Sequence, residues 1–322
     1  MISPRAAALR GHTNSIVVAA ADVGSTSVHL LVAAVDGERL DPLADESAFL
    51  GLGEAVEARS HLGSALIEML AGTIAGYAER AKTLGAAHVA FLGTDPLRRA
   101  ADAPAAVHAV GQRGGTLHVL SQREEAMLTL IGVTEGRRVE RGMLVVDVGG
   151  GSTELVVAAP DRLPTSVGLP LGASRLTGQI VRHDPPTPGE IEELGAMARE
   201  ILAGVADAGR GDLVLVGGTA SNLLRLMPEP ASGRLTQAGL AAAIDVLGGT
   251  TAADVVARYS IRPQRARVLP AGAAIVAALL ERHGPTEGRV SVAGVREGAI
   301  RAQVRAGAGW RDALPKLAGG WR

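Results

Sequence analysis

The sequence predicts an α/β protein of two domains, and three observations carry this prediction. The chain has 322 residues, a length that favours two domains with a core each. Apolar residues make up 47% of the chain and aromatic residues only 2%, so the cores must consist of Ala, Val, Leu and Ile, as is usual in α/β layers. Two similar hairpin motifs, one in each half of the chain, indicate an internal duplication.

The stronger motif, residues 144–157, reads LVVDVGGGSTELVV. Apolar runs on both sides of a glycine turn predict a strand, a tight hairpin and a return strand. Glycines let the backbone approach a ligand closely, so this turn is suited to phosphate oxygens. The expected donors are the N–H groups of Gly149, Gly150 and Gly151 and the hydroxyls of Ser152 and Thr153. Asp147 and Glu154 would repel phosphate directly, but they fit the turn if they hold a metal ion or orient water.

The weaker motif, residues 16–32, reads IVVAAADVGSTSVHLLV. Its apolar run also ends in an aspartate, Asp22, followed by a glycine and hydroxyl residues, and a second apolar run returns. Asp22 and Asp147 are 125 positions apart, which is about one domain length. A single glycine hairpin is usually an ordinary turn, but a matching pair, one in each half of the chain, is much stronger evidence for an internal duplication.

Helical periodicity predicts a helix over 61–84, then a buried strand over 87–92 and a second helix that starts at Leu97. This second helix would carry Arg98 and Arg99 in its first turn, where the helix dipole disfavours cations. Two interpretations stay open. The arginines form a solvated helix end, or they aim positive charge at an anionic ligand.

The next segment separates two neighbouring carboxylates. Ser121 and Glu124 fit a capping box, with Ser121 as N-cap and Glu124 at N3, which gives Glu124 a structural task. Glu125 has no such task, and it shares a narrow helical face with Thr129. We therefore expect Glu125 to lie in a cleft between the domains.

The second half repeats the alternation of strands and helices. It predicts a helix over 188–205, a strand over 212–216, a buried helix over 268–282 and a last strand over 290–293. The strand over 212–216 leads into a third glycine and hydroxyl turn, Gly217-Gly218-Thr219. At a helix N-terminus such a turn is a natural anion site.

The basic stretch 137–142 separates the two halves, and we place the domain boundary there. The expected division is a flexible leader over 1–15, domains over 16–136 and 137–306, and a loose tail over 307–322.

Composition excludes several classes of function. The net charge is −1 without blocks of like charge, which disfavours nucleic-acid and membrane-surface partners. The absence of cysteine excludes disulfides and thiolate chemistry. The longest apolar run, 268–280, is shorter than the roughly 20 residues of a membrane span, and neither a Walker loop nor a dinucleotide motif is present. We expect a cytoplasmic protein, and the sequence leaves a homodimer open.

The paired hairpins and the third glycine loop look like the superfold of actin, sugar kinases and heat-shock ATPases. Within it, the sequence resembles the exopolyphosphatase and guanosine pentaphosphate phosphatase family from about residue 16 to residue 302. The motifs that carry the resemblance are, in order, 22–25 (DVGS), 93–100 (GTDPLRRA), 124–126 (EEA), 147–154 (DVGGGSTE), 171–177 (LGASRLT), 184–186 (DPP), 217–219 (GGT) and 296–298 (REG). The resemblance implies two ribonuclease-H-like domains in tandem, with the active site in the cleft between them.

The resemblance also implies roles for individual residues. Glu125 would act as general base on the attacking water, and Asp147, Glu154 and Asp22 would hold Mg²⁺. The phosphates would be bound by Gly24, Ser25, Thr26, Ser27, Arg98, Gly149, Gly150, Gly151, Ser152, Thr153, Gly217, Gly218 and Thr219. This set is chemically reasonable, because phosphoanhydride hydrolysis needs charge neutralisation and an in-line water more than covalent catalysis.

The function expected first is Mg²⁺-dependent release of terminal phosphate from inorganic polyphosphate. The nearest alternative is the same reaction on the 5′ end of guanosine pentaphosphate. A nucleotide-binding regulatory protein with little turnover also stays open, because Thr26 stands where the family usually has Asn and Gly178 where it usually has an acidic residue. A kinase that phosphorylates a small alcohol is a more distant alternative.

Overall fold

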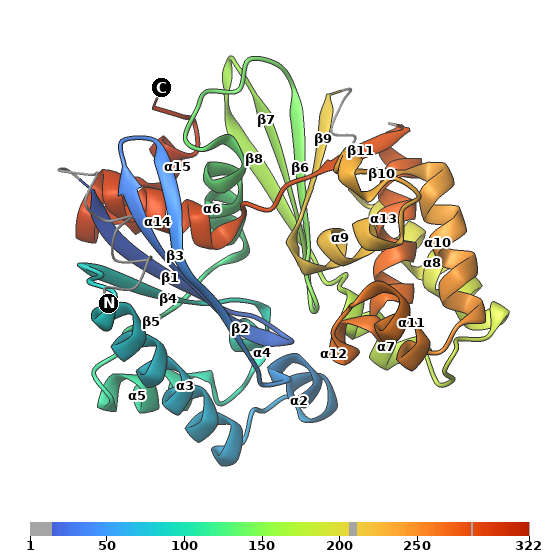
Figure 1. The fold of residues 1–322 in the computed structure, drawn as a ribbon, viewed down its shortest axis with the longest axis horizontal. Helices are drawn as coiled ribbons and strands as arrows, with labels where there is room; N and C mark the ends of the chain where they lie inside the picture. Colours follow the sequence, from blue (N-terminus) through green and yellow to red (C-terminus); the bar gives the residue numbers. More distant parts are fainter. Residues whose placement is uncertain (1–14, 206–210, 285, 322) are drawn as a thin grey trace, which may run out of the picture.

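The computed structural model describes residues 15–205, 211–284 and 286–321, so the leader expected over 1–15 lies outside the described residues except for Ser15. Two mixed sheets with helices on their faces form the molecule, which confirms the predicted α/β class (Figure 1).

The first sheet has five strands in the order β3-β2-β1-β4-β5. Its strands are β1 (Ile16–Val23), β2 (Ser27–Asp36), β3 (Arg39–Phe49), β4 (His88–Gly93) and β5 (Leu117–Val119). Strands β1, β2 and β3 form an antiparallel meander, whereas β4 runs parallel to β1 and β5 parallel to β4. The register pairs Asp22 with His29, so both residues lie at the end of the sheet where the first hairpin turns.

The second sheet has six strands in the order β10-β11-β9-β6-β7-β8. They are β6 (Met143–Val148), β7 (Thr153–Ala159), β8 (Arg162–Leu169), β9 (Asp212–Val216), β10 (Arg234–Thr236) and β11 (Glu287–Val290). The order β8-β7-β6-β9-β11 repeats the order of the first sheet, and it also repeats its parallel and antiparallel pairings. The two hairpins therefore occupy equivalent positions in a duplicated architecture.

Helices pack against the faces of both sheets. The first half contributes α2 (Leu52–Arg59), α3 (Ser64–Thr83), α4 (Asp95–Arg99), α5 (Ala103–Gln112) and α6 (Gln122–Thr134). The second half contributes α7 (Ala173–Ile180), α8 (Pro188–Ala203), α9 (Gly217–Leu223), α10 (Gln237–Gly249), α11 (Ala252–Tyr259), α12 (Pro263–Ala266) and α13 (Leu269–His283). The buried helix α13, with residues such as Ile275 and Leu279, lies in the core of the second half as its apolar run predicts.

A third apolar core joins the two halves. It combines Val18 of the first sheet and Val145 of the second sheet with buried residues of α6 and of α14 (Val295–Ala306). Although α14 comes late in the chain, it packs against β1 and α6, and Figure 1 shows its red ribbon beside the blue strand. Gln303 Nε2 of α14 also donates to Ala19 O at 3.2 Å. The two halves thus share a core on one side of the cleft.

Helix boundaries confirm several predictions and correct one. The capping box of Ser121 and Glu124 is present, and the helix expected over 61–84 forms as α3, which begins at Ser64. The helix expected to start at Leu97 begins at Asp95 instead. Arg98 and Arg99 therefore lie in its last turn, where the dipole favours cations, and the prediction that placed them in the first turn is wrong.

Two predictions for the C-terminal part are also wrong. The last strand is not 290–293 but β11, which ends at Val290, and Val292 is 91% exposed. The tail is not loose, since it forms α15 (Trp310–Leu317) with Trp310 and Leu314 buried at helical spacing. Trp310, Leu314 and Leu317 form its apolar stripe.

The C-terminal segment contacts both ends of α6. Near the start of α6, Arg311 Nε donates to Glu124 Oε1 at 2.8 Å. At the other end, Trp321 N donates to Gly136 O at 3.0 Å. Among the described residues, no helix combines the length and the apolar character that a membrane span requires.

Candidate active site

A cavity of about 300 Å³ lies where the two glycine hairpins face each other. Most of the residues predicted for the site line it, from both halves of the chain. They are Asp22, Gly24, Ser25, Thr26, Ser27, Glu125, Asp147, Gly149, Gly150, Gly151, Ser152, Gly217 and Gly218. The structure therefore brings together residues that are up to about 200 positions apart in the sequence, as close packing of a duplicated fold allows.

The second hairpin is held from behind by the first turn of α7. Gly149 O accepts from Ala173 N at 3.0 Å, Gly150 O accepts from Arg175 N at 3.0 Å, and Gly151 O accepts from Arg175 Nε at 2.8 Å. In a trans peptide the C=O and the following N–H point in opposite directions. Because three successive carbonyls face α7, the N–H groups that follow them turn away from α7, toward the cavity.

The first hairpin is held in the same way by the segment that leads into α2. Ser25 O accepts from Gly53 N at 2.8 Å, and Thr26 O accepts from Gly51 N at 3.1 Å. The approach is so close that a Cβ on Gly53 would lie 2.6 Å from Ser25 Cβ. The N–H groups of Gly24 and Gly149 are not available to an anion, because they donate to Ser27 O at 3.1 Å and to Ser152 O at 3.0 Å, which corrects the prediction of Gly149 N–H as a donor. The N–H groups that follow them in each hairpin remain as donors for an anion.

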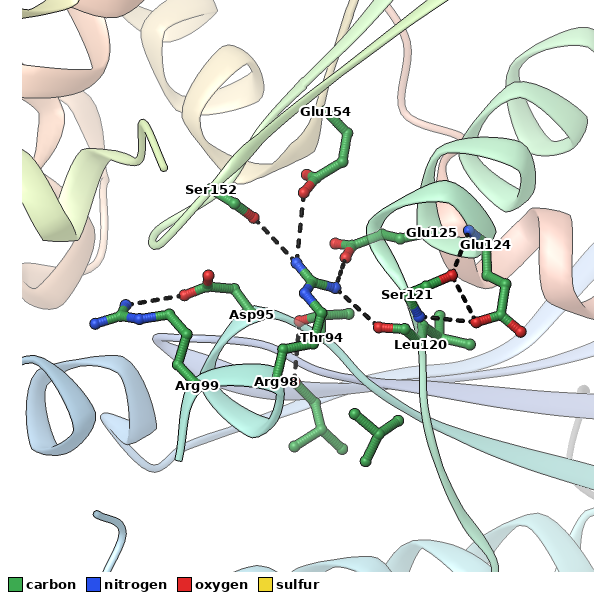
Figure 2. A network of polar contacts seen from close by, with 12 residues as sticks. Thr94, Asp95, Arg98, Arg99, Leu120, Ser121, Glu124, Glu125, Ser152 and Glu154 are labelled. Atoms are coloured by element: carbon green, nitrogen blue, oxygen red, sulfur yellow. Dashed lines mark hydrogen bonds and ion pairs between the residues drawn. The ribbon is translucent and has the colours of Figure 1, made fainter. Parts of the chain in front are cut away.

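Glu125 lies at the wall of this cavity, one residue after the capping glutamate. One carboxylate oxygen, Oε2, accepts a hydrogen bond from Arg98 Nη1 (Figure 2). Arg98 also donates to Leu120 O at 3.2 Å. Burial raises the pKa of Glu125 above its ordinary value, although the neighbouring Arg98 opposes this rise. Glu124 turns away from the cavity, where its Oε2 accepts from Ser121 N at 2.7 Å, as its capping role predicts.

Four predicted residues lie behind the cavity wall instead of lining it. Arg98 Nη2 lies 3.4 Å from Glu154 Oε1 and 3.4 Å from Ser152 Oγ, so Arg98 and Glu154 form a buried pair at the wall (Figure 2). Thr153 Oγ1 donates to Leu171 O at 2.5 Å, which is a structural contact within the second half. The side chain of Thr219 faces α13, with its Cγ2 2.5 Å from where a Cβ of Gly272 would be.

Asp22 of the first hairpin and Asp147 of the second both line the cavity. Burial, together with the nearby Glu125, raises the pKa of each aspartate from 3.8 to about 7, and Asp22 contributes to the rise at Asp147. Two buried oxygens of the first hairpin, Asp22 Oδ1 and Thr26 Oγ1, have no hydrogen-bond partner among the described residues. Buried carboxylates and hydroxyls are normally satisfied, so these atoms indicate a ligand position.

The donor set fits Mg²⁺. In the described part of the chain, no group of three or more Asp, Glu or His side chains is arranged to hold a metal ion by itself. Magnesium, however, is usually held by one or two carboxylates, with substrate phosphates and waters completing its octahedron. Asp22 and Asp147 match that requirement, and Asp22 has an oxygen without a hydrogen-bond partner among the described residues. Glu154 instead pairs with Arg98.

Three further basic or imidazole groups line the cavity, and sequence reasoning gave none of them a role in the site. Arg265 of α12 places Nη2 3.4 Å from Ser27 Oγ and 3.4 Å from His29 Nε2, and burial lowers its pKa. Arg296 at the start of α14 pairs with Asp45 at 2.7 Å. Burial, with Arg296 and Arg265 adding to it, lowers the pKa of His29 to about 4, so its ring is neutral at neutral pH. Arg296 belongs to a quoted motif, but no periodicity marks Arg265.

Comparisons with known proteins agree with this architecture. Residues 31–305 match the model of the Ppx/GppA phosphatase family. Exopolyphosphatase 1 of Mycobacterium leprae is 30% identical over 272 residues, which cover 80% of each chain. The guanosine-5′-triphosphate,3′-diphosphate pyrophosphatase of Aeromonas hydrophila is 25% identical over 295 residues, which cover 89% of this chain and 59% of that protein.

The crystal structure of the Ppx/GppA family member from Aquifex aeolicus is similar to this one, with a TM-score of 0.78 and 26% identity. The similarity covers 91% of this chain and 98% of that chain. It confirms the predicted fold of two ribonuclease-H-like domains in tandem. The family model matches most of the chain, and the overall fold is that of a solved family member. The chain therefore belongs to the Ppx/GppA phosphatase family.

Proposed function

We propose that this protein is a Mg²⁺-dependent phosphoanhydride hydrolase that releases orthophosphate from the end of inorganic polyphosphate. The observation that carries the proposal is the position of Glu125 at the wall of the cavity between two hairpins that present N–H donors. Arg98 holds the Glu125 carboxylate in place, and the surrounding burial favours its proton-accepting role.

The N–H groups of both hairpins and the hydroxyls of Ser25 and Ser152 would bind the terminal phosphoryl group. Arg265, whose Nη2 lies 3.4 Å from Ser27 Oγ, adds positive charge to the cavity. Glu125 takes a proton from the attacking water as the new O–P bond forms and the bridging P–O bond breaks, which leaves orthophosphate and a chain shorter by one unit. Binding and orientation supply most of the catalysis in such reactions.

Asp22 and Asp147 would hold the Mg²⁺ ion. When bound, Mg²⁺ supplies neutralisation of the charge on the phosphates. Without a cation, the two aspartates would repel the substrate, because both face the cavity that receives it. The unpartnered Asp22 Oδ1 is the atom that most needs such a ligand.

Two observations support polyphosphate over a guanosine nucleotide as the proposed substrate. The described residues that line the cavity include no Phe, Tyr or Trp, so the imidazole of His29 is the one ring there on which a guanine base could stack. The Mycobacterium leprae relative, which is matched over 80% of its length, is named an exopolyphosphatase. Guanosine pentaphosphate remains the second candidate, because a relative named for guanosine-5′-triphosphate,3′-diphosphate also matches most of this chain.

The test is phosphate release by the purified protein with Mg²⁺ on short polyphosphate, long polyphosphate and guanosine pentaphosphate. Glu125→Gln should lower kcat by about 10²–10⁴-fold, because it removes the proton acceptor and keeps the shape. Glu124→Gln is the matched control and should keep nearly full activity, since Gln also completes a capping box. No release from any substrate would refute the proposed function, and equal losses in the two variants would remove Glu125 from its role.

A further inference from the structure

Asp95 brings a negative charge to a cavity that should bind phosphate, and the proposed reaction does not use it. It is the first residue of α4, it lines the cavity, and it is 6% exposed. Its carboxylate packs so closely against Gly151 that a side chain at position 151 would collide with it. A buried carboxylate beside a phosphate-binding hairpin needs compensation by cations.

Two arginines, one from each half of the chain, supply this compensation. Arg99 of α4 places Nη1 3.2 Å from Asp95 Oδ2 (Figure 2). Arg175 of α7 places Nη2 3.4 Å from Asp95 Oδ1, and both side chains of this second pair are largely buried. Asp95 is therefore a bridge between the helix that carries Arg98 and the helix that holds the second hairpin.

The bridge is part of a ring that four polar contacts between side chains form with the backbone of α7. From Asp95 the ring continues through Arg99, whose Nη2 donates to Glu57 Oε2 of α2 at 2.5 Å. Glu57 Oε1 accepts from Gln179 Nε2 at 3.0 Å. Gln179 lies one helical turn after Arg175 on α7, so α7 itself closes the ring. Such a ring fixes α2 and α4 of the first half against α7 of the second.

The ring also connects the two chemical parts of the site. Arg175 donates from N to Gly150 O and from Nε to Gly151 O, so it sets the direction of the hairpin peptides. Three residues after Asp95, Arg98 holds Glu125. A shift of the Asp95–Arg175 bridge would therefore change the distance between the phosphate donors and the carboxylate that activates water.

We propose that Asp95 and Arg175 are positioning residues, which fix the second hairpin at the working distance from Glu125. This inference rests on the proposed function for its chemical readout. It adds a role for residues outside the reacting groups, because neither side chain needs to touch the substrate. The bridge holds α4 and α7 together by an ion pair that solvent reaches poorly.

The experiment is a double-mutant cycle on phosphate release with Asp95→Asn, Arg175→Met and the combined variant. Each single variant should lower kcat/KM by about 10–100-fold, since a displacement near 1 Å has that effect on an oriented reaction. The combined variant should be no worse than the poorer single variant, because both changes break the same bridge. Arg182→Ala is the matched control, because that exposed arginine bonds only to backbone carbonyls near the end of α7, and its kinetics should be unchanged.

A second variant covers the case in which the buried changes impair folding. Gln179→Glu places a like charge against Glu57 at the exposed side of the ring, and it should lower kcat/KM while the melting temperature changes little. Unchanged kinetics in this variant and in the Asp95 and Arg175 variants would overturn the inference, as would losses that multiply in the combined variant.

Failure of the proposed function gives a different pattern from failure of this inference. If the unaltered protein releases no phosphate, the readout becomes binding of inorganic pyrophosphate measured by calorimetry. Weaker binding by Arg175→Met than by Arg182→Ala would then support the positioning role, and equal binding would overturn it.

Discussion

Arg98 lies between two carboxylates, those of Glu125 and Glu154, and its side chain is only 15% exposed. From the sequence alone, an Arg98→Ala change is expected to raise KM more than it lowers stability, as for a cation that only binds substrate. The contacts change this expectation, because Arg98 also neutralises buried carboxylates. At the scale of single residues, a charged side chain that is buried, such as Arg98, contributes to the stability of the fold as well as to the proposed reaction.

Arg98→Ala should therefore lower both the free energy of unfolding and kcat. Removing one member of a buried ion pair costs about 3–5 kcal/mol, because the remaining charge stays buried. Urea unfolding together with steady-state kinetics would measure both effects. Arg113→Ala is the control, since Arg113 pairs with the exposed Glu68 and its loss should cost no more than about 1 kcal/mol. Equal stability losses in the two variants would contradict the buried role of Arg98.

At the scale of elements, the contact between α6 and α14 determines where Glu125 is held. The two helices approach so closely that a side chain on Gly132 would meet Gly294 O, and one on Gly298 would meet Leu128 O. Helices that share such glycine contacts pack backbone against backbone. The C-terminal segment adds contacts at both ends of α6, through Arg311 and Trp321. The helix that carries Glu125 thus depends on elements that are far from it in the sequence.

Gly298→Ala should destabilise the protein and reduce its activity. The added methyl forces α14 away from α6, and overpacking of this kind costs about 1–3 kcal/mol. Thermal unfolding and kcat would report the change. Gly76→Ala on α3 is the matched control, because a Cβ there meets nothing within 4 Å, and it should stabilise the protein by about 0.5–1 kcal/mol. A Gly298→Ala protein as stable and active as the control would show that the helices can separate without effect.

At the scale of the whole molecule, the two halves bring acidic groups together that neither half would concentrate alone. Asp22 comes from the first sheet and Asp147 from the second, and the pKa of each is raised from 3.8 to about 7. Between these values the folded protein binds protons that the unfolded chain has released. Without Mg²⁺, the free energy of unfolding should therefore fall as the pH rises from about 4 to about 7.

Magnesium should reverse this loss of stability. The ion binds ionised carboxylates and must displace their protons at lower pH, so the rise in melting temperature on adding Mg²⁺ should be larger at about pH 8 than at about pH 6. Melting curves at the two pH values, with and without Mg²⁺, would measure it. A variant with both Asp22→Asn and Asp147→Asn should show no such dependence. An equal rise at both pH values, or a rise that persists in this variant, would exclude the two aspartates as ligands.

The sequence by itself determined the local features of this protein. Apolar runs interrupted by glycine turns defined the two hairpins, and the spacing of Ser121 and Glu124 assigned the capping box that separates Glu124 from Glu125. These features depend on neighbours in the chain, which is why hydrophobic patterning and capping rules predict them. The repeat of one motif also predicted an internal duplication, and the matching strand orders of the two sheets agree with it.

Only the tertiary structure decided which side chains meet in the cleft and which lie behind it. Thr153 and Thr219 have the residue type of phosphate ligands, yet packing turns them toward Leu171 and Gly272. No periodic pattern in the sequence marks Arg265. It reaches the cavity because α12 places it next to Ser27 of the first hairpin. Such contacts arise between segments that are distant in the sequence. They are set by how the two halves pack around their shared core, so the local propensity of a residue carries no information about them.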